Sequence, residues 1–316
     1  MTNRVGLGRE AMRAALQLRR SLAIAREEPV NVYDIAATIG VEVRFLDAPS
    51  LEGMFLKDPH PTVLVPSLNH RPRGRVSFTC AHEIGHFQLG HGTVVDEYLE
   101  GDAEARPKSD EEFAADTFAS SLLMPRQAVL QRFLVRGLEP SDADAQTLFT
   151  IAGELDVGYE TLLKHMCWGL ELAGNDWLQD RRRTKPKEFR AAILGSKDSR
   201  RLVVAGEHWP QLPLDLEVGD YVAMPTALSV EVPALLEPAP AGMLWNVYRA
   251  KTPAPPVSPS VPLPIRFAWL VLVIADCSSI DSSTTRRLNE RPRAQTDRRK
   301  QSLRGVGTRA FACVRE

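Results

Sequence analysis

The stretch His82-Glu83-Ile84-Gly85-His86 restricts this chain more than any other. Histidines four residues apart lie on one face of an α-helix, so both imidazoles can reach one ion, and Glu83 lies beside them. Zinc in a catalytic site takes three protein ligands and keeps a position open for water, from which Glu83 could remove a proton during peptide hydrolysis. The alternative to a metal site is a surface helix whose histidines are either solvated or hydrogen-bonded in the core. Apolar residues at helical spacing, uninterrupted by proline, favour the metal helix.

A third ligand must come from elsewhere in the chain. Asp110 to Pro125 is predicted to be a second helix, on which Glu112 and Asp116 lie one turn apart and share a face. Metal sites commonly combine a ligand carboxylate with a further carboxylate that holds the ring nitrogen of a ligand histidine. We therefore predict Glu112 as the third ligand and Asp116 as the partner of a ligand histidine.

Other residues compete for these roles. His91 is one alternative ligand, although it is out of register with the known three-histidine pattern. It could instead be a cation that stabilises the helix C-terminus, just after Gly90. Glu104 is another alternative, in an acidic segment from Thr93 to Ser109 that we expect to be a mobile loop. Tyr98, in the same segment, is a candidate donor to the oxyanion at an attacked carbonyl, or else a packing residue.

Together the two motifs resemble the ImmA/IrrE family of metallo-endopeptidases. The similarity rests on Ser77 to His86 and on Glu112-x-x-Ala115-Asp116-x-Phe118-Ala119-x-x-Leu122-Leu123-Met124-Pro125, and it covers about half of the chain, roughly residues 11 to 170. In the family's pattern the third zinc ligand falls on Glu112 and the usual Asn or Asp on Asp116. The resemblance implies one zinc ion per chain, in a cytoplasmic peptidase that cuts a helix-turn-helix repressor once and so relieves repression, in a mobile element or a stress response. It leaves open whether Zn²⁺ or Mn²⁺ is the working metal.

Composition agrees with a cytoplasmic protein. The chain has 316 residues, of which 44% are hydrophobic and 25% charged, as in ordinary globular proteins of one or two domains. Its four cysteines are scattered and never form C-x-x-C, which fits a reducing compartment without a disulfide framework. The strongest apolar run, Phe267 to Ala275, is far below the ~20 residues needed to span a bilayer. We expect no membrane association.

We predict an α+β fold with a zincin-like helical peptidase core and a small β-sheet. The four predicted parts are a zinc peptidase domain at 1–135, a helix-turn-helix-like helical segment at 136–180, a small β-rich or α+β domain of unknown role at 188–277, and a basic, disordered tail at 278–316. The predicted elements outside the metal helices are helices at 9–27 and 32–39, strands at 41–46, 53–56 and 61–65, and later strands at 201–205, 216–223 and 267–275. The early strands could offer an edge to an extended substrate, or only cover the core.

The helical segment suggests a different class of function. Leu148 to Leu162 has the pattern of a helix-turn-helix, but its second helix begins with Glu160 and offers only Lys164 and His165 to phosphates. A structural or substrate-docking helical pair is therefore favoured over DNA binding. The alternative function is a DNA-binding or regulatory protein with a structural or vestigial zinc site, against which an intact Glu83 argues. A third hypothesis is a metal-gated peptidase that cuts only under stress.

Overall fold

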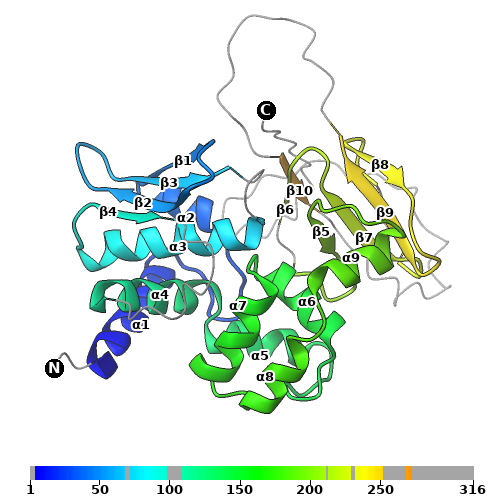
Figure 1. The fold of residues 1–316 in the computed structure, drawn as a ribbon, viewed down its shortest axis with the longest axis horizontal. Coiled ribbons are helices and arrows are strands. Elements are labelled where there is room, and N and C mark those ends of the chain that lie inside the picture. The colour runs from blue at the N-terminus through cyan, green and yellow to red at the C-terminus, as the bar shows by residue number, and fades with distance from the viewer. Residues whose placement is uncertain are drawn as a thin grey trace, which may run out of the picture.

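The computed structural model describes residues 4–67, 72–97, 109–210, 213–228, 232–251 and 268–271. Within them the fold is mixed α+β, with a sheet and helices around α3, a helical group, and a second sheet farther along the chain (Figure 1). Tyr98, Glu104 and the predicted tail at 278–316 lie outside the described residues. None of the described helices is both long enough and apolar enough to cross a lipid bilayer.

The first sheet has four strands in the order β1-β3-β2-β4. Its strands are β1 (Glu42–Leu46), β2 (Leu51–Leu56), β3 (Thr62–Pro66) and β4 (Val94–Glu97). Strand β1 is parallel to β3, whereas β2 is antiparallel to both β3 and β4. The first three strands confirm the prediction, but the loop predicted from Thr93 was wrong at β4. Two consecutive valines favour a strand there, and β2 supplies an edge for them to extend.

Helix α3 (Arg73–Leu89) carries the histidine motif and lies between this sheet and two other helices. It contacts β2 and β3 on one side and α1 (Arg4–Ser21) and α4 (Asp110–Leu123) on the other (Figure 1). The short helix α2 (Val32–Thr38), predicted at 32–39, also contacts it and is capped by Asn31. Gly90 ends α3 in the left-handed conformation, with φ of 76°. The helix is therefore buried on nearly all sides, which is why its sequence is apolar around the motif.

The helical boundaries differ from the prediction at three places. Helix α1 ends at Ser21 rather than at residue 27, because the chain turns at Ala23, which has a φ of 56°. Helix α4 ends at Leu123 rather than at Pro125, and the proline precedes the next helix as its N-cap residue. In the helical segment predicted at 136–180, the first helix, α6, begins only at Ala145, because the Asp144 side chain caps it by accepting from the Thr147 amide at 2.7 Å.

A group of short helices follows α4 (Figure 1). These are α5 (Arg126–Leu134), α6 (Ala145–Glu154), α7 (Tyr159–Lys164), which continues as a π-helical turn at His165–Gly169, α8 (Asn175–Arg181) and α9 (Pro186–Leu194). Helices α6 and α7 coincide with the predicted helix-turn-helix-like pair. Helix α8 falls at the end of the helical segment predicted at 136–180, whereas α9 was not predicted.

The second sheet has the strand order β5-β7-β9-β8. Its strands are β5 (Leu202–Val204), β7 (Tyr221–Pro225), β8 (Leu236–Ala239) and β9 (Trp245–Ala250), and a separate pair is formed by β6 (Pro213–Leu216) and β10 (Ala268–Val271). The single strand predicted at 216–223 was wrong, because a turn containing Gly219, with φ of 96°, separates β6 from β7.

A buried ionic network joins the start of α3 to the two later parts of the fold. Arg73, only 4% exposed, contacts Asp156 in the α6–α7 turn at 3.2 Å, and it also pairs with Asp215 of β6. Arg201 contacts Asp156 at 3.2 Å, and the Ser77 hydroxyl donates to Asp156 at 2.7 Å. Burial alone would raise the pKa of Asp156, but Arg73 and Arg201 outweigh burial and lower it. The network therefore favours the ionised form of Asp156.

Gly74 allows the same junction to pack tightly. A Cβ at this position would lie 2.4 Å from the carbonyl carbon of Val157, so no side chain fits between α3 and the α6–α7 turn.

We expect that replacing Arg73 by Met will destabilise the protein strongly. The change leaves Asp215 buried without its cation, and breaking a buried pair costs about 3–5 kcal/mol. Urea unfolding followed by circular dichroism measures the loss. Arg44→Met is the matched control, because Arg44 and Glu42 form a pair whose side chains are 61% and 52% exposed, so water screens the pair and its loss should cost little stability. Equal unfolding midpoints for the two variants would contradict the role given to Arg73.

Candidate metal centre

Three side chains from α3 and α4 converge on one point. The Nε2 atoms of His82 and His86 lie 3.0 Å apart. Of the two Glu112 carboxylate oxygens, Oε2 lies 3.2 Å from Nε2 of His82 and Oε1 lies 3.4 Å from Nε2 of His86. His82 is 6% exposed and His86 is fully buried, whereas the Glu112 side chain is 25% exposed. The residues predicted as metal ligands are thus brought together at a site that reaches the surface through Glu112.

These distances suit a zinc ion. Tetrahedral ligands about 2.0–2.1 Å from zinc lie about 3.3 Å from one another, close to the separations of 3.0, 3.2 and 3.4 Å between the donor atoms here. Two imidazoles and one carboxylate are also a donor set of catalytic zinc sites, which leave the fourth position open. Among the described residues, His82, His86 and Glu112 form the group whose donor atoms could hold a metal.

The outer nitrogens of both histidines have partners as well. Nδ1 of His82 donates to the Asp116 carboxylate at 2.9 Å, which leaves Nε2 available to a metal. Nδ1 of His86 lies 2.8 Å from Nδ1 of His91. His91 therefore faces the outer side of a candidate ligand instead of joining the three donors. When His86 binds through Nε2, its Nδ1–H donates to His91.

The position of His91 follows from the turn that ends α3. Its backbone amide donates to the His86 carbonyl at 3.0 Å, just after the left-handed Gly90, and this bond folds the chain back onto the helix. Burial, reinforced by the neighbouring His86, lowers the pKa of His91 and favours the neutral ring that can accept a hydrogen bond. The sequence analysis did not predict this role for His91. The only feature of the sequence that could have indicated it is the Gly-His pair directly after the helix.

Helix α4 positions Glu112 in its first turn. Ser109 caps this helix, because its hydroxyl accepts from the Glu112 amide at 3.1 Å. Acidic residues are favourable at this end of a helix, and three occur in succession from Asp110. Hydrogen bonds from His82 and then His86 hold the pKa of the Glu112 carboxyl well below its usual range, although burial opposes them. Glu112 is therefore ready to act as an anionic ligand.

Glu83 lies inside the protein against β2. Glu83 is fully buried. A Cβ atom at Gly53 would lie only 2.3 Å from the Oε1 atom of Glu83. The same Cβ would lie 2.6 Å from Cγ2 of Thr79. Position 53 also falls at an irregularity in the pairing between β2 and β4. The sequence analysis did not select Gly53, although a glycine inside a strand often marks such a close approach.

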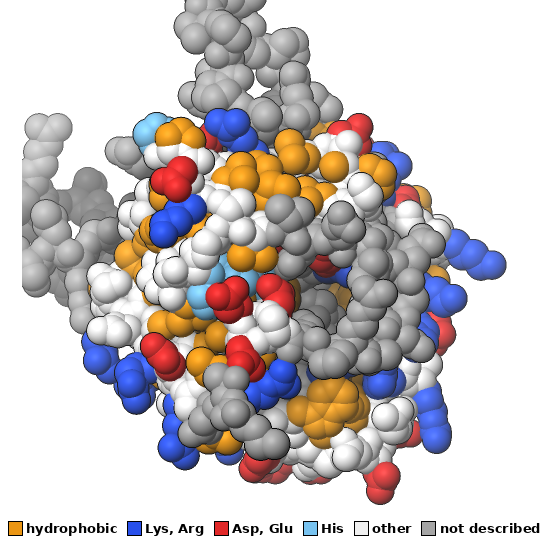
Figure 2. Space-filling view, turned by 60° about the vertical axis from the view of Figure 1, so that its left-hand side comes forward, with side chains coloured by type: hydrophobic (Ala, Val, Ile, Leu, Met, Phe, Trp, Pro, Cys, Tyr) orange, Lys and Arg blue, Asp and Glu red, His pale blue; other side chains and the backbone are white. Residues whose placement is uncertain are grey.

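The surface around the centre agrees with this arrangement. Histidine side chains lie directly beside acidic side chains on the face that contains α3 and α4 (Figure 2). Tyr98 and Glu104 lie outside the described residues, so the roles predicted for them remain predictions.

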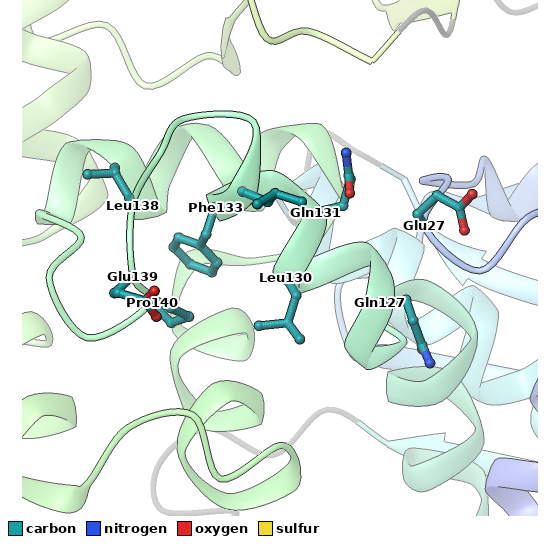
Figure 3. Close-up of a pocket in the computed structure, with 9 residues that line it drawn as sticks. Glu27, Gln127, Leu130, Gln131, Phe133, Leu138, Glu139 and Pro140 are labelled. Carbon is teal, nitrogen blue, oxygen red and sulfur yellow. The ribbon is translucent and has the colours of Figure 1, made fainter.

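Two hollows elsewhere on the protein contain none of the candidate metal ligands. One, of about 550 Å³, lies over α5 and the segment after it, with Leu130 and Phe133 on its wall and Glu27 and Glu139 at its border (Figure 3). The other, of about 860 Å³, adjoins the first turn of α3.

A comparison with protein families gives a match to this part of the chain. Residues 36–166 match the family model described as Peptidase_M78, IrrE N-terminal-like domain. The matched region contains the sheet, α3, α4 and all three candidate ligands. No curated protein matches the chain.

Replacing Glu112 by Ala should weaken zinc binding by more than the about 10- to 100-fold that partners outside the ligand shell contribute. The reason is that the change removes the only anionic donor of the three. Competition with a zinc-sensitive dye measures the affinity, with one equivalent expected for the unaltered protein. Glu111→Ala is the matched control, since Glu111 is exposed on the same helical turn. If Glu112→Ala binds zinc as well as Glu111→Ala does, another residue is the third ligand.

Proposed function

We propose, from the membership of residues 36–166 in the ImmA/IrrE family of metallopeptidases, that this chain is a zinc-dependent endopeptidase with a zincin-like core. The observation that carries the proposal is the convergence of His82, His86 and Glu112, with donor atoms within 4.8 Å of one another, next to a glutamate in the motif. A closed structural site would need a fourth protein ligand and would have no use for Glu83.

The chain's own residues divide the work of hydrolysis between them. His82, His86 and Glu112 would hold zinc, which supplies a Lewis acid that polarises the scissile carbonyl and makes water more acidic. Glu83 accepts a proton on its carboxylate from the attacking water and then delivers it to the nitrogen of the leaving amine. Asp116 and His91 keep the two imidazoles oriented through their Nδ1 atoms. Gly53 leaves the space that the Glu83 carboxylate occupies.

The edge of the first sheet suits an extended peptide. Strand β4 is paired on one side only, with β2, among the described residues. A substrate segment could add to that edge through main-chain hydrogen bonds. This supports endopeptidase activity, because a strand-like segment in the middle of a polypeptide can pair along its length.

We infer the substrate from the family resemblance. It would be a helix-turn-helix repressor, cut at one site in the cytoplasm so that repression is relieved, in a stress response or a mobile element. What supports a protein partner is that the chain continues beyond the matched region with further helices and a second sheet, on which a folded protein could dock.

DNA binding by α6 and α7 receives little support from their contacts. Glu160, at the start of α7, pairs with Arg182 and with Lys164, the latter at 3.4 Å. The hydroxyl of Tyr159 donates to the Arg181 carbonyl at 3.0 Å. Leu162 and other side chains of α7 are buried, so this helix is anchored against its neighbours and its cations are already partly neutralised.

Glu83→Gln should retain zinc and lose cleavage. The amide is nearly the same size as the carboxylate but cannot take a proton from water. Purified protein, with and without zinc, is incubated with helix-turn-helix repressors from its own genome, and mass spectrometry detects a discrete cut. We expect one metal-dependent cut that is absent with Glu83→Gln. A cut of equal rate by the variant would remove Glu83 from the mechanism, and zinc binding without any cut would revive the DNA-binding alternative, which a gel-shift assay tests.

Gly53→Ala should leave zinc affinity unchanged and lower the cleavage rate by about 100-fold, the usual effect of a misplacement near 1 Å. The new methyl group must push the Glu83 carboxylate aside, whereas the ligands on α3 and α4 are not touched. Zinc titration and cleavage rates are measured on the same preparation. Gly92→Ala is the control, because a Cβ there meets no atom within 4 Å. Equal rates for both variants would show that β2 does not position Glu83.

A further inference from the structure

The cavity of about 860 Å³ lies between three parts of the fold. Its walls come from the first turn of α3, the α6–α7 turn, the N-terminus of α9, strand β5 and the turn between β6 and β7. Arg73, at the start of α3, is nine residues before His82, which corresponds to about 14 Å along a helix axis. The cavity is therefore separate from the metal centre, and its volume is within the range of small-molecule sites.

Positive charge predominates on its walls. Seven arginine and lysine residues line the cavity, against four aspartate and glutamate residues. Three of the four acids already have cations beside them: Asp156 contacts Arg73 and Arg201, Asp220 lies 3.9 Å from Arg201, and Glu160 pairs with Arg182. The surplus charge therefore falls on the remaining cations.

Two of these cations come from α9. Among the described residues, neither Lys185 nor Arg190 has an ion pair, and the buried Nε of Arg190 has no hydrogen-bond acceptor. Burial lowers the pKa of Arg190, and the negative charge of Asp198 opposes this effect. Asp198 is itself engaged, since it accepts from the Tyr221 hydroxyl at 2.9 Å. A partly desolvated guanidinium with an unused donor is costly unless an anion completes it.

The remaining walls favour a phosphate group next to an apolar body. Helix α9 presents its N-terminal turn, without a side-chain cap, beside Lys185, so backbone donors add to the positive potential. Arginine's planar fork matches phosphate oxygens. Phe149 and Tyr159 also line the cavity, and Phe149 stacks on Phe189 at 5.6 Å. Aromatic side chains next to cations suit a planar ring that carries a phosphate.

We propose that this cavity binds a small phosphorylated molecule of about nucleotide size. A ligand in the cavity would contact α3, because Arg73 and Arg75 belong to both the cavity wall and that helix. Arg75 also forms a two-pronged pair with Glu52, at 2.8 and 2.9 Å, directly before the Gly53 that adjoins Glu83.

Titration calorimetry on the full-length, zinc-loaded protein tests the proposal with AMP, ribose 5-phosphate and adenosine at constant ionic strength. We expect AMP and ribose 5-phosphate to bind with a Kd below about 1 mM, and adenosine to bind at least about 10-fold more weakly than AMP, since the phosphate contributes most. Tighter binding of AMP than of ribose 5-phosphate would identify a nucleotide, and equal binding a sugar phosphate. If neither phosphorylated compound binds, or adenosine binds as well as AMP, the proposal is wrong.

Two variants locate the site. Arg190→Gln and Lys185→Gln should each weaken AMP binding by about 10-fold, roughly the value of one charge-assisted contact. Lys187→Gln is the matched control, because Lys187 is exposed on the same turn of α9 and does not line the cavity. Equal weakening by all three variants would mean unspecific attraction and would overturn the site. Within the part of the chain that the structure describes, neither Lys185 nor Arg190 is in an ion pair, so unchanged melting temperatures without AMP verify that the variants are folded.

Discussion

Placing polar groups inside a buried helix is the constraint on which this structure depends. Helix α3 lies between the sheet and two helices, yet two histidines and a glutamate occur within one turn of it. Buried polar atoms are costly unless each finds a partner. For the two histidines, helix α4 meets this requirement with Glu112 and Asp116, and the turn after α3 meets it with His91. The same contacts that make the helix tolerable in the core also orient its Nε2 atoms toward one point.

The same requirement is met differently at the other end of α3. Arg73 is buried at the start of the helix, and its carboxylate partners come from the α6–α7 turn and from β6. Contacts with two later parts of the chain are thus needed to keep the first residue of the metal helix in place. Since a buried charge cannot be abandoned without a large loss of stability, the parts beyond the peptidase core belong to its folding, and not only to its recognition of other molecules.

The sequence was informative wherever a local pattern determines the structure. Helical spacing placed His82, His86 and Glu112 on the two helices that meet, and the order of the two motifs indicated the family of residues 36–166. Long-range packing was not predictable in this way. Gly53 matters only because β2 crosses Glu83, and His91 only because the chain folds back after Gly90. The cavity near α9 could not be foreseen at all, because its walls come from segments more than a hundred residues apart.

The first turn of α3 connects the candidate metal centre with the cavity between α3 and α9. Arg75 faces the cavity and pairs with Glu52, and the next residue along β2 is the glycine that leaves room for the Glu83 carboxylate. An anion in the cavity competes with Glu52 for the Arg75 guanidinium, because both are acceptors for the same donors. Since a shift of β2 at Gly53 would move the surroundings of Glu83 and not the ligands on α3 and α4, such competition would change the position of the general base while leaving the metal ligands in place.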